Sequence, residues 1–257
     1  MKKTYYEFSA PLSLKIIFIS DLHKAEVLPW SEEIFSEERP DLILFGGDMV
    51  SRTSTDFTNY ELLCRAATGC CPVYACAGNH EQSLPDNYYA VYKSINEKYG
   101  IHYLENRTES LDIGGCKLNI TGLTLPYGVY RNERGGFSGL LSYSLPEMRE
   151  AVGEKREGFN ILLAHNPIFL DVYSAWGADI VFSGHVHGGI VRLPLVGGLL
   201  SPERRFFPKY TKGIYSLGNT KMCLSAGIGK IRVFNPAETV IANLVRSQGL
   251  REDVWLR

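Results

Sequence analysis

The chain contains a series of short apolar segments, each of which ends at a glycine or a polar residue. Short runs that are apolar throughout are typical of strands buried on both faces, as in the sheets of α/β proteins. We therefore expect a layered sheet protein. Its strands are expected at Leu14–Ser20, Asp41–Gly47, Pro72–Gly78, Asn160–His165 and Ala178–Gly184.

Segments with helical character separate most of these strands. The resulting alternation of strands and helices is typical of an α/β sheet protein. Five helices are expected, at Ser31–Glu38, Tyr60–Ala67, Tyr88–Tyr99, Leu145–Val152 and Phe169–Trp176.

The alternation weakens in two stretches, Glu109–Leu125 and Ile190–Arg246. Both contain pairs of turn-forming residues, which are typical of hairpins. The pairs are Gly114-Gly115, Gly197-Gly198 and Gly218-Asn219. These stretches predict a second, mainly antiparallel sheet.

No internal repeat, low-complexity tract or proline-rich linker divides the chain, so we expect a single domain over residues 1–257. The hydrophobic content of 45% suits a globular protein with a sizeable core. A net charge of -1 provides no overall positive field, which argues against nucleic acid as a partner.

The six cysteines form no C-x-x-C pair, so free thiols are expected rather than disulfides or a zinc site. The start, Met1-Lys2-Lys3, is similar to the basic region of a signal peptide. The apolar stretch that follows is broken by Lys15 and is too short to cross a bilayer. These features favour a reducing compartment and predict a cytoplasmic protein that is either soluble or peripheral at a membrane.

Five of the six histidines lie beside the C-terminal ends of the apolar segments, where open α/β sheets place their ligands. The first segment leads into Asp21-Leu22-His23. Residues two apart in an extended chain point to the same side, so Asp21 and His23 are candidate ligands of one ion. The alternative is that Asp21 caps a helix and His23 lies on the surface.

The second and third apolar segments also end in candidate metal ligands. Asp48 follows Gly46-Gly47, which permit a sharp turn and close backbone approach before a carboxylate that can bridge two cations. The third segment ends in Gly78-Asn79-His80-Glu81. The alternative for this cluster is a loop turn in which Asn79 adopts a left-handed conformation.

Two later segments supply three more histidines. One ends at His165, and the other leads into Gly184-His185-Val186-His187-Gly188. Each imidazole needs hydrogen-bond partners, so histidines flanked by glycines are easier to explain as ligands than as core residues. Solvent-facing histidines on an edge strand are the alternative. Imidazole, carboxylate and amide groups without a thiolate suit Mn²⁺, Fe²⁺ or Zn²⁺.

Taken in order, these motifs resemble those of the calcineurin-like metallophosphoesterase superfamily. The resemblance covers residues 21–189 and rests on Asp21-x-His23, Gly47-Asp48, Gly78-Asn79-His80-Glu81, His165 and Gly184-His185-x-His187. It implies a four-layer αββα sandwich of two mixed β-sheets flanked by helices. It also implies a metal-dependent phosphohydrolase, that is, a phosphatase or phosphodiesterase.

The resemblance divides the ligands between two divalent ions, with Mn²⁺ expected and Fe or Zn²⁺ as alternatives. It implies that Asp21, His23 and His187 hold one ion. It implies that Asn79, His165 and His185 hold the other, and that Asp48 bridges the two. A hydroxide shared by the ions would then attack phosphorus.

His80 remains unligated in this scheme and protonates the leaving oxygen as the catalytic acid. Many relatives carry an acid three residues after the bridging aspartate, where it orients this histidine, but this chain has Ser51. The next residue, Arg52, is expected either to bind the substrate phosphate or to form an exposed salt bridge.

Downstream, residues 188–194 and 206–210 resemble bacterial membrane-associated phosphoesterases, some of which act on lipid-linked pyrophosphates. We therefore expect hydrolysis of a phosphomonoester, phosphodiester or pyrophosphate bond in a small or lipid-linked substrate. The basic and aromatic segment Arg204–Lys212 is a candidate for peripheral membrane contact. Alternatively, its aromatic side chains pack on the second sheet and its charges are solvated.

Two other classes of function are open at this point. One is a catalytically inactive, metal-binding scaffold for protein interaction, and the other is a peripheral lipid-binding protein that uses Arg204–Lys212. The complete set of ligand residues favours the enzyme over the scaffold. The glycine- and arginine-rich loop Tyr127–Gly139 is expected to be mobile and close to a site.

Overall fold

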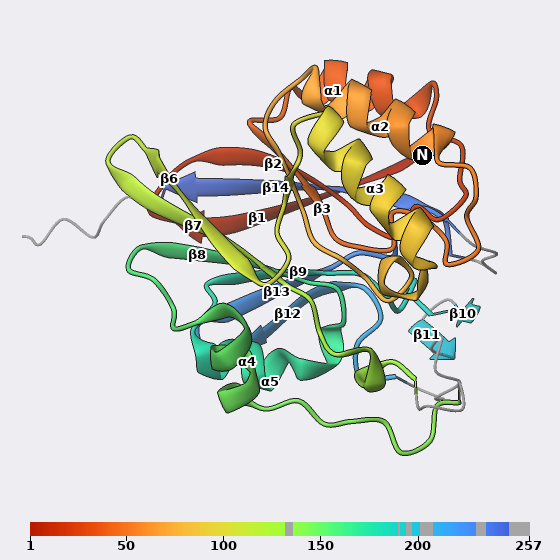
Figure 1. Cartoon of the computed structure of the whole chain (residues 1–257). Helices are drawn as coiled ribbons and strands as arrows, with labels where there is room; N and C mark the ends of the chain where they lie inside the picture. Colours follow the sequence, from red (N-terminus) through yellow and green to blue (C-terminus); the bar gives the residue numbers. More distant parts are fainter. Residues whose placement is uncertain (132–135, 190, 194–196, 201–207, 230–234, 247–257) are drawn as a thin grey trace, which may run out of the picture.

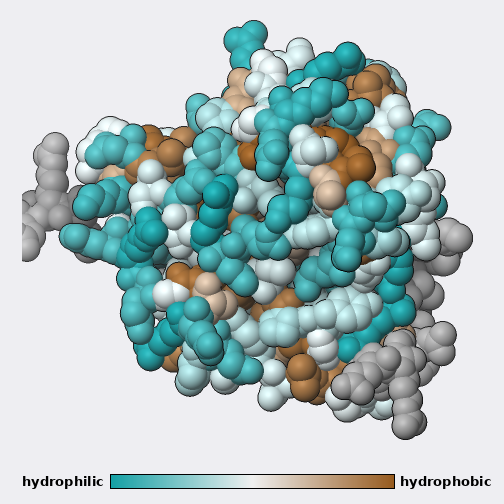
Figure 2. All heavy atoms as spheres, viewed as in Figure 1, coloured by the Kyte–Doolittle hydropathy of each residue, from teal (hydrophilic) through white to brown (hydrophobic). Residues whose placement is uncertain are grey.

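The computed structural model of the chain describes residues 1–131, 136–189, 191–193, 197–200, 208–229 and 235–246, with the backbone alone at 191–193 and 197–200. Two six-stranded sheets pack face to face, and helices cover their outer faces (Figure 1). The predicted four-layer αββα sandwich is confirmed. Hydrophilic residues cover most of the face in Figure 2, and the apolar strands lie inside.

The first sheet has the strand order β1-β14-β2-β3-β4-β5. Its strands are β1 (Lys2–Ala10), β14 (Glu238–Arg246), β2 (Leu14–Ile19), β3 (Leu42–Phe45), β4 (Val73–Ala75) and β5 (His102–Tyr103). Strands β2, β3 and β4 confirm the first three predicted strands. Strand β1 is missed by the search for apolar runs because it carries charged and hydroxyl side chains, which suit the edge of a sheet.

The second sheet has the order β12-β13-β9-β8-β7-β6. Its strands are β12 (Gly213–Leu217), β13 (Thr220–Leu224), β9 (Ile180–Ser183), β8 (Phe159–Ala164), β7 (Cys116–Leu123) and β6 (Arg107–Ile113). The prediction of a mainly antiparallel sheet is wrong, because β7, β8, β9 and β13 pair in parallel. Helical crossovers join β7 to β8 and β8 to β9, and such connections return the chain in the same direction.

Two of the three predicted hairpin turns are confirmed. Gly114-Gly115 joins β6 to β7, and Gly218-Asn219 joins β12 to β13, both as antiparallel pairs. Gly197-Gly198 instead lies within β11 (Gly197–Leu200), which pairs with β10 (Val191–Leu193) in a separate two-stranded sheet.

All five predicted helices are present. They are α1 (Trp30–Glu38), α2 (Thr58–Thr68), α3 (Asp86–Lys98), α4 (Leu145–Val152) and α5 (Leu170–Trp176), with 3₁₀ turns η1 (Glu81–Ser83), η2 (Tyr127–Val129) and η3 (Pro167–Phe169). Helices α1–α3 cover the first sheet, and α4 and α5 cover the second (Figure 1). No helix within the described ranges is long and apolar enough to cross a bilayer.

Three hydrophobic cores fill the spaces between the four layers, and alternate residues of one strand enter different cores. In β2, Ile16 and Phe18 pack between the sheets, whereas Ile17 and Ile19 pack against helices α1–α3. This two-sided burial explains why the strands are apolar throughout. It also fixes the strands, so that the polar residues after them are held at defined positions.

Candidate metal centre

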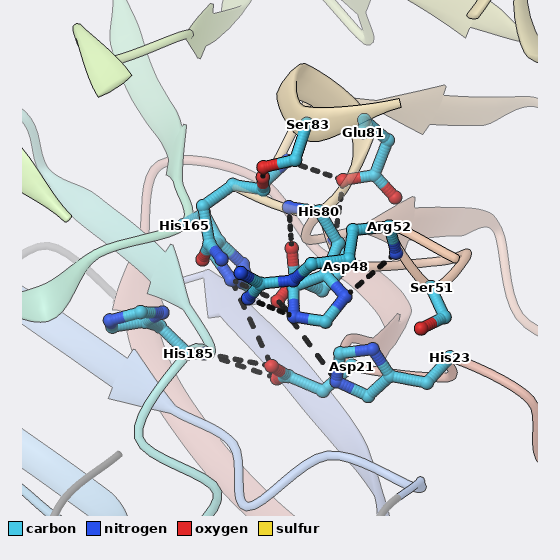
Figure 3. Close-up of polar contacts among 12 residues, drawn as sticks. Asp21, His23, Asp48, Ser51, Arg52, His80, Glu81, Ser83, His165 and His185 are labelled. Carbon is cyan, nitrogen blue, oxygen red and sulfur yellow. Dashed lines mark hydrogen bonds and ion pairs between the residues drawn. The ribbon is translucent and has the colours of Figure 1, made fainter. Parts of the chain in front are cut away.

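The seven side chains predicted as metal ligands follow strands of both sheets, and Figure 3 shows five of them gathered together. Asp21 and His23 follow β2, Asp48 follows β3, Asn79 follows β4, His165 follows β8, and His185 and His187 follow β9. Each is buried, with no more than 7% of its surface exposed. The rigid strands therefore carry a dense set of polar side chains at one edge of the sandwich.

Five of these residues have left-handed backbone conformations, which are unfavourable for residues with a side chain. The φ angles are 54° at Asp21, His23 and Asp48, 70° at His185 and 51° at His187. Backbone hydrogen bonds hold the turns together: Asp21 N–H donates to Gly47 O at 3.0 Å, and His23 N–H donates to Asp48 O at 3.1 Å. Strain that is maintained in this way is characteristic of functional sites.

Asp48 lies at the middle of the cluster. Its Oδ2 is 3.3 Å from His165 Nε2, 3.8 Å from His80 Nε2 and 4.0 Å from His23 Nε2. Its Oδ1 accepts a hydrogen bond from the backbone N–H of His80 at 2.7 Å. One carboxylate therefore faces imidazoles carried by both sheets.

Asp21 is the second buried carboxylate of the cluster. The backbone N–H of His185 donates to both of its oxygens at 3.1 Å. Its Oδ1 lies 3.7 Å from His187 Nδ1 and 3.8 Å from His165 Nε2. Asp21 and Asp48 are thus linked through His165.

Glycines allow the turns to approach these carboxylates. A Cβ at Gly78 would lie 2.4 Å from Asp48 Oδ1, and a Cβ at Gly184 would lie 2.3 Å from Asp21 Oδ2. Gly47 has a φ of 85°, and a Cβ there would lie 2.6 Å from the nitrogen of Gly78. Any larger residue at these positions would displace a carboxylate or the adjacent turn.

The ligand atoms form three groups in which all members lie within 4.8 Å of one another. One group contains the three residues expected to hold one ion, and a second contains His165 and His185, expected on the other ion, together with Asp48. The third brings His80, which is expected to stay unligated, as close to Asp48 as a ligand would be. The groups are Asp21, His23 and His187; Asp48, His165 and His185; and His23, Asp48 and His80.

The chemistry of the cluster fits a pair of divalent cations. Within the described residues, Asn79 Oδ1 is buried and makes no hydrogen bond. Leaving such atoms unpaired is costly unless another partner binds them. Imidazole nitrogens, carboxylate oxygens and an amide oxygen are suitable ligands for Mn²⁺, Fe²⁺ or Zn²⁺.

Electrostatics keep the central carboxylate ionised. Burial alone would raise the pKa of Asp48, but the imidazoles of His165 and His80 hold it well below its usual range. Burial would lower the pKa of His165, but Asp48 raises it to about 9. Burial raises the pKa of Asp21. Cations would replace protons in a cluster of this kind, because metal binding releases protons from its ligands.

His80 is oriented by Arg52 instead of an acid at position 51. The backbone N–H of Arg52 donates to His80 Nδ1 at 3.0 Å, and Arg52 Nη2 lies 2.9 Å from His80 Nε2 (Figure 3). The Ser51 hydroxyl instead lies 3.5 Å from the hydroxyl of Thr53. A neutral imidazole has one acceptor nitrogen, so it can accept from only one of the two Arg52 groups at a time.

Glu81 supports the cluster, a role that the sequence did not predict. It is fully buried and accepts hydrogen bonds from the backbone N–H groups of Asp48 (2.9 Å), Val50 (3.1 Å) and Gly78 (2.8 Å). Burial, followed by the charge of Asp48, raises the pKa of Glu81 to about 7. The sequence signal that could have indicated this role is the position of Glu81 in the motif Gly78-Asn79-His80-Glu81. One side chain joins the turns after β3 and β4.

The segment Tyr127–Arg131 borders the cluster. The ring of Tyr130 is buried and lies 5.0 Å from His185 and 6.3 Å from His165 between centroids. Burial lowers the pKa of Arg52, and the charge of Arg131 lowers it further. The expected closeness of the loop Tyr127–Gly139 to the site is confirmed for Tyr130; residues 132–135 lie outside the described ranges.

The basic and aromatic segment is described only from residue 208 onward, and Arg204–Phe207 lie outside the described residues. Tyr210 is buried with the helices of the second sheet, and Lys212 forms an ion pair with buried Glu238 at 3.2 Å. Lys209 is exposed and lies over the ring of Tyr210. In its described part, Tyr210 therefore packs with the second sheet, and Lys212 pairs with β14 of the first sheet.

A hollow of about 170 Å³ opens beside His23, between the turn after β3 and the start of α2. His23 thus lines both the candidate metal centre and this hollow. Most of the other lining residues are polar: Lys24, Ser54, Thr55, Asp56 and Asn59, together with Val50, Phe57 and Tyr60. A ligand at the metal centre would have a small polar space next to it.

Two solved structures with a similar fold are a hydrolase and a nucleotidase. Phosphopantetheinyl hydrolase (PptH) from Mycobacterium tuberculosis is 15% identical with a TM-score of 0.50, covering 82% of this chain and 88% of that one. NAD nucleotidase (NadN) from Haemophilus influenzae is 14% identical with a TM-score of 0.52, covering 84% and 51%. At these identities the likeness concerns the fold alone.

Sequence relatives extend the comparison. Phosphodiesterase YaeI of Escherichia coli is 26% identical over 223 residues, covering 84% of this chain and 76% of YaeI. UDP-2,3-diacylglucosamine pyrophosphatase LpxG of Chlamydia muridarum is 26% identical over 282 residues, covering 89% and 82%. The family profile of the calcineurin-like phosphoesterases matches residues 14–189. The chain therefore belongs to the calcineurin-like phosphoesterase family, whose members are metal-dependent phosphohydrolases that bind two divalent ions.

Proposed function

We propose that this phosphohydrolase cleaves a phosphomonoester, phosphodiester or pyrophosphate bond in a small or lipid-linked substrate. The main observation behind this proposal is that the buried Asp48 carboxylate lies close to histidines of both sheets. The activities after which two relatives are named, a phosphodiesterase and a UDP-2,3-diacylglucosamine pyrophosphatase, support this range of substrates. The small polar hollow beside His23 suits the group next to the reacting phosphate.

For the two ions we propose the ligand assignment that the family resemblance implies, and the grouping of the ligand atoms supports it. Asp21, His23 and His187 would hold one ion and Asn79, His165 and His185 the other, with Asp48 shared. When bound, two divalent ions lower the pKa of water and stabilise the charge that develops on the oxygens at phosphorus. We propose Mn²⁺ as the native metal, with Fe and Zn²⁺ as alternatives that this ligand set also suits.

His80 is proposed to donate a proton to the leaving oxygen. Because the Arg52 backbone N–H donates to Nδ1, a neutral ring carries its hydrogen on Nε2, the nitrogen that faces Asp48. To act as an acid the ring takes up a second proton at Nδ1, which breaks the bond from the Arg52 N–H, and returns to the neutral form when Nε2 gives its proton to the leaving oxygen. Arg52 is proposed to leave His80 Nε2 when substrate binds and to pair with the phosphate, to which a guanidinium can donate two parallel hydrogen bonds. The nearby charge of Arg131 favours an anion at the same place.

A leaving-group series tests these roles. Wild type, His80→Ala and Arg52→Ala are assayed with Mn²⁺ on aryl phosphodiesters whose leaving phenols differ in pKa. Loss of a proton donor should reduce kcat most for the poorest leaving groups, whereas loss of Arg52 should mainly raise KM. Arg107→Ala, a change of an exposed arginine on β6, is the matched control. Equal losses across the whole series for His80→Ala would contradict its role as an acid.

The cellular location is also proposed, as cytoplasmic with peripheral membrane contact through Arg204–Lys212. The free thiols of all six cysteines are compatible with a reducing compartment. Co-sedimentation with vesicles of phosphatidylglycerol, compared with neutral phosphatidylcholine vesicles, tests the membrane contact. Binding to the anionic vesicles that is lost at high salt is expected, and no binding to either would contradict it.

A further inference from the structure

The turn that carries His187 is built from three consecutive residues with left-handed backbones. The φ angles are 51° at His187, 70° at Gly188 and 89° at Gly189. His187 has a side chain and is therefore strained in this conformation, which persists only where the surroundings hold it. The identity of the residues that hold it determines how well the imidazole is positioned.

Asn235 holds this turn from a distant part of the chain. Its side-chain Nδ2 donates to the carbonyl oxygen of His187 and, at 3.3 Å, to that of Gly189. The side chain is buried, with 3% of the residue exposed. A Cβ at Gly188 would lie 2.7 Å from Asn235 Nδ2, so glycine at 188 allows the amide to sit between the two carbonyls.

The segment around Asn235 is itself anchored. Three residues later, the backbone N–H of Glu238 donates to Gly227 O at 3.0 Å, and Glu238 Oε1 accepts from Ala226 N–H at 2.8 Å. The same 225–229 loop donates to the cluster, because Gly229 N–H bonds to Asp21 O at 2.7 Å. Gly229 therefore contacts Asp21, and Asn235 contacts the His187 turn.

Gly229 and Asn235, which make these contacts, lie after the region that the family profile matches, which ends at residue 189. Asp21, His23 and His187 form one of the three ligand groups, and His187 Nδ1 lies 3.7 Å from Asp21 Oδ1. Among the described residues, Asn235 donates no hydrogen bond to the group formed by Asp48, His165 and His185. The support is therefore directed to one half of the centre.

We propose that Asn235 is a positioning residue that sets the affinity of the ion held by Asp21, His23 and His187 and leaves the other ion largely unaffected. The inference rests on the proposed two-ion centre. Residues that orient a metal ligand contribute about 10- to 100-fold to metal affinity. The Asn235 amide holds the backbone of His187 in place before the ion binds. Ion binding then costs less conformational entropy in this turn.

The test is calorimetric titration of the metal-free full-length chain with Mn²⁺. Asn235→Asp keeps the size of the side chain but places an oxygen where Nδ2 meets two carbonyls, so that repulsion replaces two hydrogen bonds. Asn235→Ala removes the two hydrogen bonds without adding repulsion. It is the variant to test if Asn235→Asp does not fold. Asn243→Asp makes the same chemical change on β14 away from the cluster and is the matched control.

Asn243→Asp should bind two ions, each with an affinity similar to that of the wild type for the same ion. Asn235→Asp should weaken one of the two binding events by about 10- to 100-fold, with a smaller loss for Asn235→Ala in the same event. Unchanged affinities in both Asn235 variants, or equal weakening of both events, would overturn the proposal. A wild type that binds two ions but hydrolyses no phosphoester would contradict the proposed function and leave this inference standing.

Discussion

His165 Nε2 lies 3.3 Å from Asp48 Oδ2, and both side chains are almost completely buried. One residue follows a strand of the first sheet and the other a strand of the second, so this contact joins the two halves of the sandwich at the candidate metal centre. The Asp48 carboxylate raises the pKa of His165 to about 9. In the metal-free protein a protonated imidazole therefore balances part of the charge that cations would otherwise balance.

Metal loading should therefore stabilise the fold. The cations replace the proton on His165 and bind the buried Oδ1 of Asn79, which makes no hydrogen bond among the described residues. A single site loaded at a hundred times its Kd adds about 2.7 kcal/mol to the free energy of unfolding. Thermal unfolding with Mn²⁺ should show a higher Tm than after chelation. An identical Tm under both conditions would indicate that the cluster binds no metal in the folded state.

Replacing Gly78 with alanine should damage the centre without a large change in the sheets. The added Cβ would lie 2.4 Å from Asp48 Oδ1 and 2.6 Å from its backbone nitrogen, so the carboxylate or the turn must move. We expect Mn²⁺-dependent activity to fall at least about tenfold. Gly69→Ala, at the exposed end of α2 with an ordinary φ of -69°, is the control and should retain activity. Full activity in Gly78→Ala would show that Asp48 does not need its observed position.

The ion pair between Lys212 and Glu238 predicts a large effect on stability. Glu238 is fully buried, and it accepts from Lys212 Nζ at 3.2 Å and from the Thr4 hydroxyl at 3.0 Å. Lys212→Met leaves this carboxylate without its cation, which should cost about 3–5 kcal/mol in urea unfolding. Lys221→Met removes an exposed lysine on β13 and should change the same free energy by less than about 0.5 kcal/mol.

Glu38 gives the fold a predictable response to acid. Burial would raise its pKa, but the Tyr5 hydrogen bond and the Lys3 ion pair outweigh burial and lower it below the ordinary value of 4.5. A carboxylate with a lowered folded-state pKa contributes stability that is present above its unfolded pKa and is lost as the pH falls through the folded one.

Glu38→Gln should therefore destabilise the protein by about 1 kcal/mol at neutral pH, and the difference from wild type should shrink in acid below the ordinary glutamate pKa. Unfolding in urea at neutral and acidic pH measures this change. Glu33→Gln, an exposed substitution on the same helix, is the control. A difference that stays constant with pH would rule out the ionised form of Glu38 as its source.

The sequence predicted the elements of the fold better than their pairing. Strands such as β2 are apolar throughout because each face enters a different hydrophobic core, and this produces a clear local signal. The parallel direction of β8 and β9 follows from crossovers through α4 and α5, whereas the expectation for the second sheet rested on the hairpin turns of Glu109–Leu125 and Ile190–Arg246. Local patterns do not say which strands share a sheet. The mainly antiparallel second sheet was therefore a wrong expectation, and edge strand β1 was missed.

The candidate centre was predictable to the extent that its residues are local to strand ends. Asp21, Asp48 and His165 each follow an apolar run, so their types and positions stood out. The contact that orients His80 was not predictable, because it comes from the backbone N–H of Arg52 and carries no side-chain signal. Asn235 was missed because it meets the His187 turn across 48 residues of sequence.

The most direct test of the two-ion hydrolase compares the initial rate of bis(4-nitrophenyl) phosphate hydrolysis with Mn²⁺ between wild type and Asp48→Asn. The central carboxylate is replaced by a neutral amide of the same shape, so both ions should lose their shared ligand. The exposed substitution Asp112→Asn on β6 is the control. We predict Mn²⁺-dependent turnover in wild type and control that falls by more than about 100-fold in Asp48→Asn. Equal rates in Asp48→Asn and wild type would contradict the account.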